Sequence, residues 1–277
     1  MKRSFIILLL SVFLPLHGCI KEGDGIDAGQ ETTERTVVFS LVNGSQTRST
    51  TPGEDELNEN LVESLDVFFF DDAEACLFYP SASQMTKTGS TVKIVIPESD
   101  ALRLFDKDIK LYIAANTHLP RTQMEGKTYP ELVEVLQTAS GFNPENFVKQ
   151  DDFLMDGILE VPNLTEDRTN LGTVTLERAA SKIVVNITSA SVQGYSVVDA
   201  SVRINNYLEK TSLGKEAPLY DASPSDFIHS GYRPIWIPEL GGPRFDSGPF
   251  YSYANDWEYG DTTESYITIR VKWYKDE

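Results

Sequence analysis

The sequence predicts a mainly β protein whose folded body consists of β-sandwiches, preceded by a signal peptide and a flexible tether. Segments in which apolar and polar residues alternate recur from residue 36 onward, which is typical of strands buried on one face. Turn-rich stretches separate these segments, as in a sandwich of short antiparallel strands. A positively charged start and an apolar run come before them, and this combination indicates an export signal.

Residues 1–18 have the pattern of a lipoprotein signal peptide. Lys2 and Arg3 precede the apolar run 5–16, which is too short to cross a bilayer core of about 30 Å. The letters LHGC that follow resemble a bacterial lipobox, apart from the histidine, which stands where a small residue is usual. The resemblance implies that Cys19 carries the acyl chains, palmitate among them, and becomes the mature N-terminus. The alternative is a chance cysteine after an ordinary signal peptide.

Residues 19–35 are polar and acidic without an apolar period, so we expect a flexible tether between the lipid and the folded body. The formal net charge of the chain is −18, which argues against a nucleic-acid partner because such binding needs a basic face. The only cysteines are Cys19 and Cys76. Two cysteines exclude a disulfide framework and a thiolate zinc cluster.

The alternating segments predict the strands of the body, and in the first of them Val37, Phe39 and Leu41 share one face. The predicted strands are 36–42, 61–71, 76–79, 91–97, 109–116, 157–161, 172–176, 181–188, 196–208 and 265–274. Segment 109–116 is nearly all apolar, which favours a central strand. Residues 210–262 are rich in Gly, Pro and Tyr and predict long loops.

One short helix is predicted from Thr128, as its N-cap, to Gly141, with Leu132, Val135 and Leu136 on one face. Polar residues near 176–182 interrupt two apolar strands. We therefore expect an N-terminal domain over 36–176 and a C-terminal domain over 177–277, and whether the second domain is complete stays open. The alternative is one continuous large sandwich.

Residues that would carry catalysis or bind a metal are sparse. His118 and His229 stand apart from each other, and no nucleophile elbow, phosphate loop or paired-histidine motif occurs. Acidic residues are plentiful, but their abundance does not select the carboxylate pair that a glycosidase needs. We expect no enzymatic activity, no metal and no cofactor. The tyrosine-rich region 207–259 leaves sugar binding open as an alternative.

The polar loop 43–56 contains Arg48 and lies between two strong predicted strands. Exposed polar loops of this kind are preferred sites of proteolytic cleavage. A plain connecting loop with a surface arginine is the other interpretation.

The order of these features resembles the fimbrillin family, the type V pilins of Bacteroidetes. The resemblance rests on the lipobox, the acidic tether, one amphipathic strand, the Arg48 loop, and the segments SLDVFFFD, LYIAANTH and LERAASKIVVNI. It runs from Cys19 to about residue 185. It implies two transthyretin-like β-sandwich domains and a precursor of a fimbrial subunit at the outer membrane, with a role in cell adhesion.

The resemblance also implies a processing step. An arginine-specific protease would cut the bond between Arg48 and Ser49, so that the strand carrying Val37, Phe39 and Leu41 leaves and another subunit supplies a strand in its place. The other candidate, Arg35, precedes the strand, and a cut there would free only the tether. Further partners implied are other fimbrial subunits, the outer membrane through the lipid, and surface ligands on host or bacterial cells.

Family stalk subunits continue beyond the position that matches 265–274. Three interpretations are therefore open: a truncated sequence, a donor strand at 265–274 itself, or a non-stalk subunit that accepts a strand without donating one. Two rival functions also stay open. One is a surface glycan-binding lipoprotein that keeps its lipid, and the other is a secreted hydrolase that uses an acidic pair.

Overall fold

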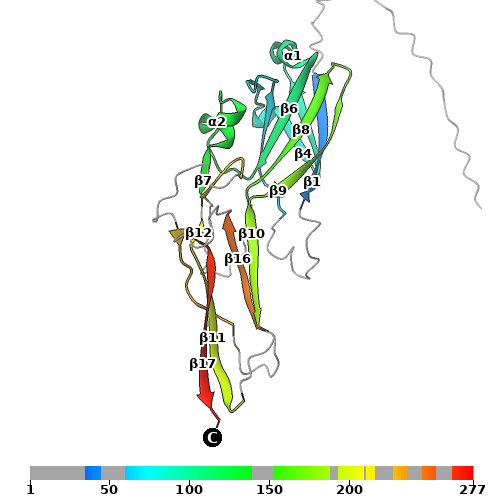
Figure 1. Cartoon of the computed structure of the whole chain (residues 1–277). Helices are drawn as coiled ribbons and strands as arrows, with labels where there is room; N and C mark the ends of the chain where they lie inside the picture. Colours follow the sequence, from blue (N-terminus) through cyan, green and yellow to red (C-terminus); the bar gives the residue numbers. More distant parts are fainter. Residues whose placement is uncertain are drawn as a thin grey trace, which may run out of the picture. The chain divides into compact units, whose positions relative to one another are not determined.

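The computed structural model describes residues 35–44, 60–138, 153–187, 193–208, 210–215, 227–235, 245–253 and 264–276. These residues form mainly β-strands with few helices, as predicted (Figure 1). Cys19, Arg48 and Ser49 lie outside the described residues.

Eight strands form the first sheet, in the order β3-β2-β6-β8-β9-β1-β5-β4. Their bounds are β1 Arg35–Asn43, β2 Leu65–Phe70, β3 Cys76–Phe78, β4 Met85–Thr88, β5 Thr91–Ile96, β6 Lys107–Ala115, β8 Met155–Leu164 and β9 Asn170–Arg178. The strand β6 lies inside the sheet, between β2 and β8, which confirms the central position expected for it.

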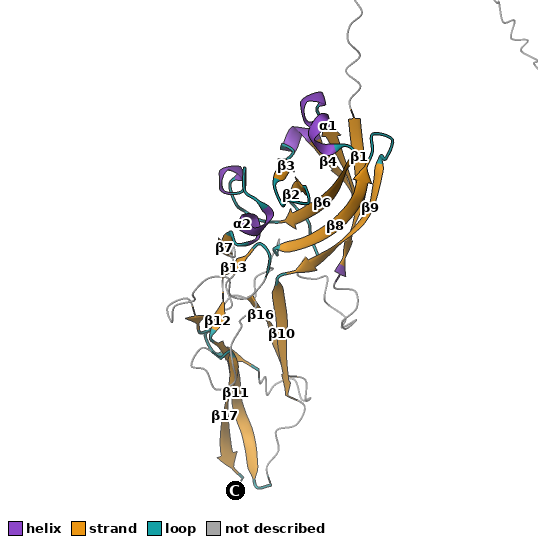
Figure 2. Ribbon diagram, turned by 45° about the horizontal axis from the view of Figure 1, so that its top comes forward, coloured by secondary structure: helices purple, strands orange, loops and turns teal. Residues whose placement is uncertain are grey.

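The sheet folds into two layers around one core. β8 and β9 pair only at one end, through Met155 with Arg178 and Asp156 with Glu177, so the two halves of the sheet separate beyond that point (Figure 2). Buried side chains of both halves then pack into the same hydrophobic core. This is the arrangement of a β-sandwich.

The alternation predicted for the first strands is confirmed. In β5 the side chains of Val92, Ile94 and Ile96 are buried while Thr91 and Lys93 are exposed. In β1 the side chains of Val37, Phe39 and Leu41 are buried, and those between them are partly exposed. The alternation of buried and exposed side chains along a strand is a local property, so it can be recognised in the sequence without knowing which strands pair.

The predicted helix begins where expected but is shorter. α2 covers Tyr129–Val133, and Thr128 forms a capping box with Glu131, which satisfies orphan backbone donors at the start of the helix. The extension to Gly141 is wrong for its described part, because Leu136–Thr138 form strand β7. Its partner is β13, Lys210–Ser212, with Leu136 opposite Ser212. A tertiary strand pairing has overridden the local helical period.

A second α-helix, α1, covers Glu98–Leu104 and has no clear signal in the sequence pattern. Only Ala101 and Leu104 are buried in it, so its apolar stripe is too short to detect. Two short 3-10 helices, Ala82–Gln84 and Arg121–Gln123, complete the helical part of the described chain.

The later strands form two further sheets around a second core. One sheet has the order β10-β16-β12-β14 and the other β15-β11-β17. Their bounds are β10 Ala180–Ile187, β11 Tyr195–Asn205, β12 Tyr207–Leu208, β14 Phe227–Ile228, β15 Arg233–Pro234, β16 Phe245–Tyr253 and β17 Tyr266–Lys275. The second core also contains Phe68, Phe70 and Tyr112 from the first sheet. The predicted division at residue 176 stays a prediction.

The prediction of loops over 210–262 is wrong for the short strands β13, β14 and β15 and for the longer β16, which pairs with β10 along most of its length. Gly248 and Pro249 conceal this strand in the sequence, because both residues are rare inside central strands. The register shifts between Val184 and Asn186, next to the pair Val184–Pro249. A bulge at this point lets the sheet accommodate a proline that lacks a backbone N–H.

Candidate functional site

The strand β1 is enclosed on both edges. It pairs antiparallel with β5, from Arg35 opposite Ile96 to Ser40 opposite Thr91. It pairs parallel with β9, with a register shift between Val38 and Phe39. Since both edges carry ladder hydrogen bonds, β1 completes the sheet from an inner position (Figure 1).

The side chains on the inward face of β1 are buried in the first core. Val37 and Phe39 are 0% exposed and Leu41 is 6% exposed. All three belong to the cluster that joins the two layers of the sandwich. Burying a side chain of this size is worth about 1.5–3 kcal/mol, so the three together contribute about 5–9 kcal/mol as an upper estimate.

The start of β1 is held by an arginine between two carboxylates. The guanidinium of Arg35 lies 2.9 Å from Glu98 Oε2 and 2.9 Å from Glu166 Oε1. It also lies 5.8 Å from the ring centroid of Phe105. The hydrogen bond to Glu98 raises the pKa of Arg35 above its ordinary value. A protease that binds the Arg35 side chain would first have to break its contacts with both carboxylates.

The end of β1 also makes close contacts with neighbouring segments. Asn43 Nδ2 donates to the carbonyl oxygen of Asn60 at 3.2 Å. A Cβ atom on Gly44 would lie 3.0 Å from Thr175 Cγ2 and 3.2 Å from the carbonyl oxygen of Leu176, so β1 leaves the sheet in close contact with β9. Beyond Gly44 the chain enters residues 45–59, which contain the predicted cleavage site and lie outside the described residues.

This arrangement has a direct consequence for a chain that loses β1. The facing edges of β5 and β9 would present unpaired backbone groups, and Val92, Ile94 and Val174 would lose part of their cover. A strand-sized apolar slot with two open edges is a strong template for another strand.

Other groups of polar residues do not assemble a catalytic centre in the described residues. His118 and His229 are both exposed. The described ranges contain no cluster of three His, Cys, Asp or Glu side chains able to hold a metal ion. Cys76 is partly buried, and burial raises the pKa of its thiol, which makes it a poor nucleophile.

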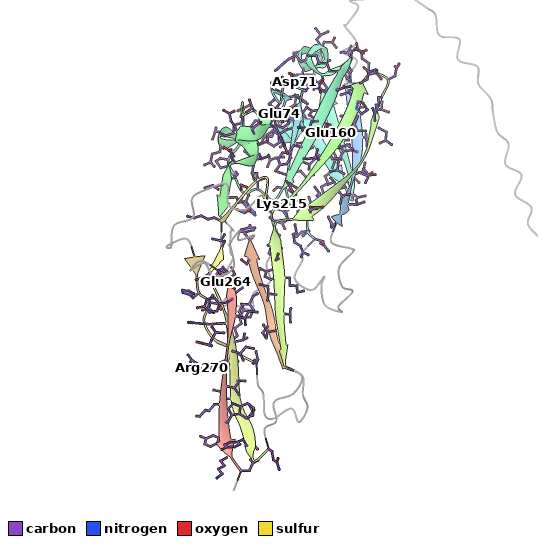
Figure 3. All side chains as sticks on the ribbon, in the orientation of Figure 1. Asp71, Glu74, Glu160, Lys215, Glu264 and Arg270 are labelled. Atoms are coloured by element: carbon purple, nitrogen blue, oxygen red, sulfur yellow. The ribbon has the colours of Figure 1, made fainter. Side chains whose placement is uncertain are left out.

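A cavity of about 670 Å³ lies beside α2 and β8 and contains a lysine–carboxylate group that the sequence did not signal. Lys215 contacts Asp156 and lies 3.4 Å from Glu177 (Figure 3). Burial raises the pKa of Asp156, although Lys215 acts in the opposite direction. The hydroxyl of Tyr112 donates to the carbonyl oxygen of Leu213 at 2.7 Å. We interpret this lysine–carboxylate group as a structural ion pair that links β8 to the turn after β13.

Fold and site together define a class: a β-sandwich protein whose first strand completes the core from an inner position. Residues 35–205, more than half of the chain, match the family model described as the major fimbrial subunit protein (FimA) of P. gingivalis. The chain therefore belongs to the FimA family of major fimbrial subunit proteins, and the resemblance to the fimbrillin family is confirmed. No curated protein sequence matches it.

Solved structures with a similar fold include two candidate cell-adhesion proteins of Parabacteroides distasonis ATCC 8503. The first is 17% identical with a TM-score of 0.55, and the match covers 87% of this chain and 75% of the other. The second is 12% identical with a TM-score of 0.50 and covers 87% and 84%. At these identities the likeness concerns the fold alone.

Membership of this family places the protein among the fimbrial proteins of the cell surface. Within the described ranges, no helix has the length and hydrophobicity needed to span a bilayer.

Proposed function

We propose that this chain is the precursor of a fimbrial subunit that is exported as a lipoprotein, processed at an arginine and assembled by donor-strand exchange for cell adhesion. The observation that carries the proposal is the inner position of β1, with Val37 and Phe39 fully buried between two paired neighbours. A strand of this kind remains part of the fold as long as the peptide chain that connects it to the rest of the body is intact.

Export would place the protein at the outer membrane. Residues 1–18 are removed, Cys19 receives the lipid, and the acidic tether 19–35 holds the body away from the bilayer surface. The tether leads directly into β1, so the lipid and β1 form one continuous segment. A single cut after β1 therefore separates the subunit from its membrane anchor.

The bond between Arg48 and Ser49 is the proposed site of that cut. It lies after β1, in the polar loop that leads toward β2. Arg35 is a poorer substrate, because both of its terminal nitrogens contact carboxylates and its side chain is only 22% exposed. A cut at Arg35 would also leave β1 paired with β5 and β9, so the slot between those two strands would not open.

Refilling the slot would join subunits without covalent links. The incoming strand must place apolar side chains at alternate positions, as Val37, Phe39 and Leu41 do, and must pair with β5 and β9. Burial of about 5–9 kcal/mol, with the ladder hydrogen bonds added, is enough to hold neighbouring subunits together. The partners are then other fimbrial subunits, an arginine-specific protease and surface ligands, and the role involves no catalysis.

We further propose that the body is divided at residue 176 into an N-terminal domain, 36–176, and a C-terminal domain, 177–277. The proposed boundary lies near the end of β9, and Ala179 is the one residue between β9 and β10. Each side of the division contributes the larger part of one hydrophobic core.

The test is the mature N-terminus of the protein on its native cell surface, determined by intact mass and peptide mapping. A chain that begins at Ser49 without lipid is the expected result. The variant Arg48→Gln should keep the lipidated Cys19 and fail to polymerise, whereas the matched control Arg35→Gln should be processed normally. A wild-type chain that begins at lipidated Cys19 with Arg48 intact would contradict the proposal.

A further inference from the structure

Three charged side chains from distant parts of the chain meet beside the cavity at α2 and β8. Lys215, in the turn after β13, contacts the carboxylate of Asp156 on β8. Its Nζ also lies 3.4 Å from Glu177 Oε2 and 3.4 Å from the carbonyl oxygen of Glu177 on β9. Asp156 and Glu177 are directly paired residues of β8 and β9, so their side chains lie on the same face of the sheet. The amine of Lys215 therefore lies against two neighbouring carboxylates.

The turn that carries Lys215 is held against α2 and β6. The N–H of Gly214 donates to the carbonyl oxygen of Val133 at 2.9 Å, and the hydroxyl of Tyr112 donates to the carbonyl oxygen of Leu213 at 2.7 Å. The amine on this turn and the carboxyl on the paired strand β8 are thus kept in one geometry. Such positioning corresponds to an effective concentration of about 10⁵–10⁸ M in intramolecular reactions.

The surroundings of Asp156 favour the uncharged forms of an amine and an acid. The side chain of Asp156 is 9% exposed, and burial raises the pKa of its carboxyl although Lys215 acts in the opposite direction. Burial penalises charge on either group. Transfer of the proton from Lys215 to Asp156 leaves a neutral amine beside a carboxylic acid, and these are the two forms that condense to an amide.

We propose that Lys215 and Asp156 condense to an isopeptide bond, an amide between their side chains, with Glu177 as the proton carrier. Nζ attacks Cγ of the protonated Asp156 carboxyl, and the N–C bond forms. The carboxylate of Glu177 takes a proton from the nitrogen and passes it to the Asp156 hydroxyl, which leaves as water when the C–O bond breaks. Glu177 is returned unchanged, and no oxidant, reductant or further reactant is consumed.

The product links β8 covalently to the turn after β13 and closes residues 156–215 into a loop. A cross-link of this kind stabilises the folded chain by restricting the unfolded one. The free carboxyl of Asp156, and any dependence of stability on its titration, belongs to the chain before this step. The bond involves neither β1 nor the loop with Arg48, so failure of this proposal and failure of strand exchange are independent results.

The test is the intact mass of the full chain after denaturation. We expect the wild type to be lighter by one water than the mass calculated for its N-terminus, and Lys215→Arg to have the full mass. Arginine keeps the positive charge, but its guanidinium stays protonated and does not condense. Glu177→Gln keeps the shape of the side chain without the proton carrier. It should condense at least about a hundredfold more slowly, measured as the condensed fraction at intervals after synthesis.

Lys110→Arg is the matched control. Lys110 lies 3.4 Å from Glu74 in another lysine–carboxylate pair near the cavity, but it does not contact Asp156. This variant should lose one water as the wild type does.

Peptide mapping locates the bond. Trypsin does not cleave after an acylated lysine, so we expect a branched peptide that contains both Asp156 and Lys215. An Asp–Gly sequence also loses one water when its carboxyl closes onto the backbone nitrogen of the glycine, here Gly157. That product is a linear peptide, and it would persist in Lys215→Arg.

Three results would overturn the proposal. One is a wild-type chain of full mass that trypsin cleaves after Lys215. Another is a loss of water confined to Asp156 and Gly157. The third is the same loss of water in Lys215→Arg as in the wild type. The map of the wild-type chain decides the first two without any variant, so the test does not depend on the folding of a variant.

Discussion

Replacement of Phe39 by alanine tests whether β1 is part of the folded core, as any strand-exchange function requires. Phe39 is 0% exposed and lies between Val92 on β5 and Gly172 on β9. Alanine at this position removes the ring and leaves a cavity between the two layers. Phe→Ala changes in cores cost about 3–5 kcal/mol of unfolding free energy.

That cost is a large part of the whole stability of a domain, which is typically about 5–15 kcal/mol. Val42→Ala is the matched control on the same strand, because Val42 is 45% exposed. A substitution at such a surface position changes the free energy by about 0.5 kcal/mol or less. The two variants therefore differ by severalfold in expected effect although they lie three positions apart.

The assay is equilibrium urea unfolding of the intact, uncleaved chain, followed by far-UV circular dichroism. Phe39→Ala should lower the transition midpoint strongly with little change in its slope, and Val42→Ala should leave the midpoint nearly unchanged. A loss below about 1 kcal/mol for Phe39→Ala, or equal losses for both variants, would refute the reasoning. β1 would then contribute too little to the core for its replacement to hold subunits together.

Three further predictions concern local features of the fold. Thr128→Ala removes the N-cap of α2 and should cost about 1 kcal/mol, with faster hydrogen exchange over 129–133; unchanged exchange would contradict the capping role. Gly157→Ala should cost about 1–3 kcal/mol, measured by thermal unfolding, because the new Cβ would collide with the carbonyl oxygen of Thr175 and lie 2.8 Å from Val174 Cγ1. Burial raises the pKa of Asp156 in the folded state, so its contribution to stability is fully present below the ordinary carboxyl pKa and is lost as the pH rises through the raised value. Asp156→Asn should therefore gain stability relative to the wild type across that interval in urea unfolding, and a difference that does not vary with pH would show that this carboxyl does not titrate as described.

The sequence alone determined where the first strands lie in the chain and which of their faces is buried. The alternation of Val37, Phe39 and Leu41, and of Val92, Ile94 and Ile96, identifies both strands and their buried faces. Thr128 also marks the start of α2 correctly. These signals are local, because side-chain direction in a strand and capping at a helix end depend on neighbouring residues.

Only the tertiary structure decided how these elements are combined. Nothing near Arg35 in the sequence indicates that its side chain lies between Glu98 and Glu166. The helical period that continues to Leu136 gave way to a pairing with Ser212. Strand partners, ion pairs and the end of a helix depend on residues far apart in the chain, and local propensity is weaker than the burial and hydrogen bonding that such contacts supply.

The same difference applies to the exposure of β17. The alternation of β17 predicted an ordinary half-buried strand, but its paired partners on β11 are buried while Ile267 and Ile269 remain exposed. Periodicity shows which side chains share a face, whereas cover for that face must come from elements elsewhere in the chain or from another molecule. The sequence thus determined the first strands of this fimbrial protein and their buried faces. The tertiary structure decided the strands that local patterning missed, such as β16, and placed β1 inside a core.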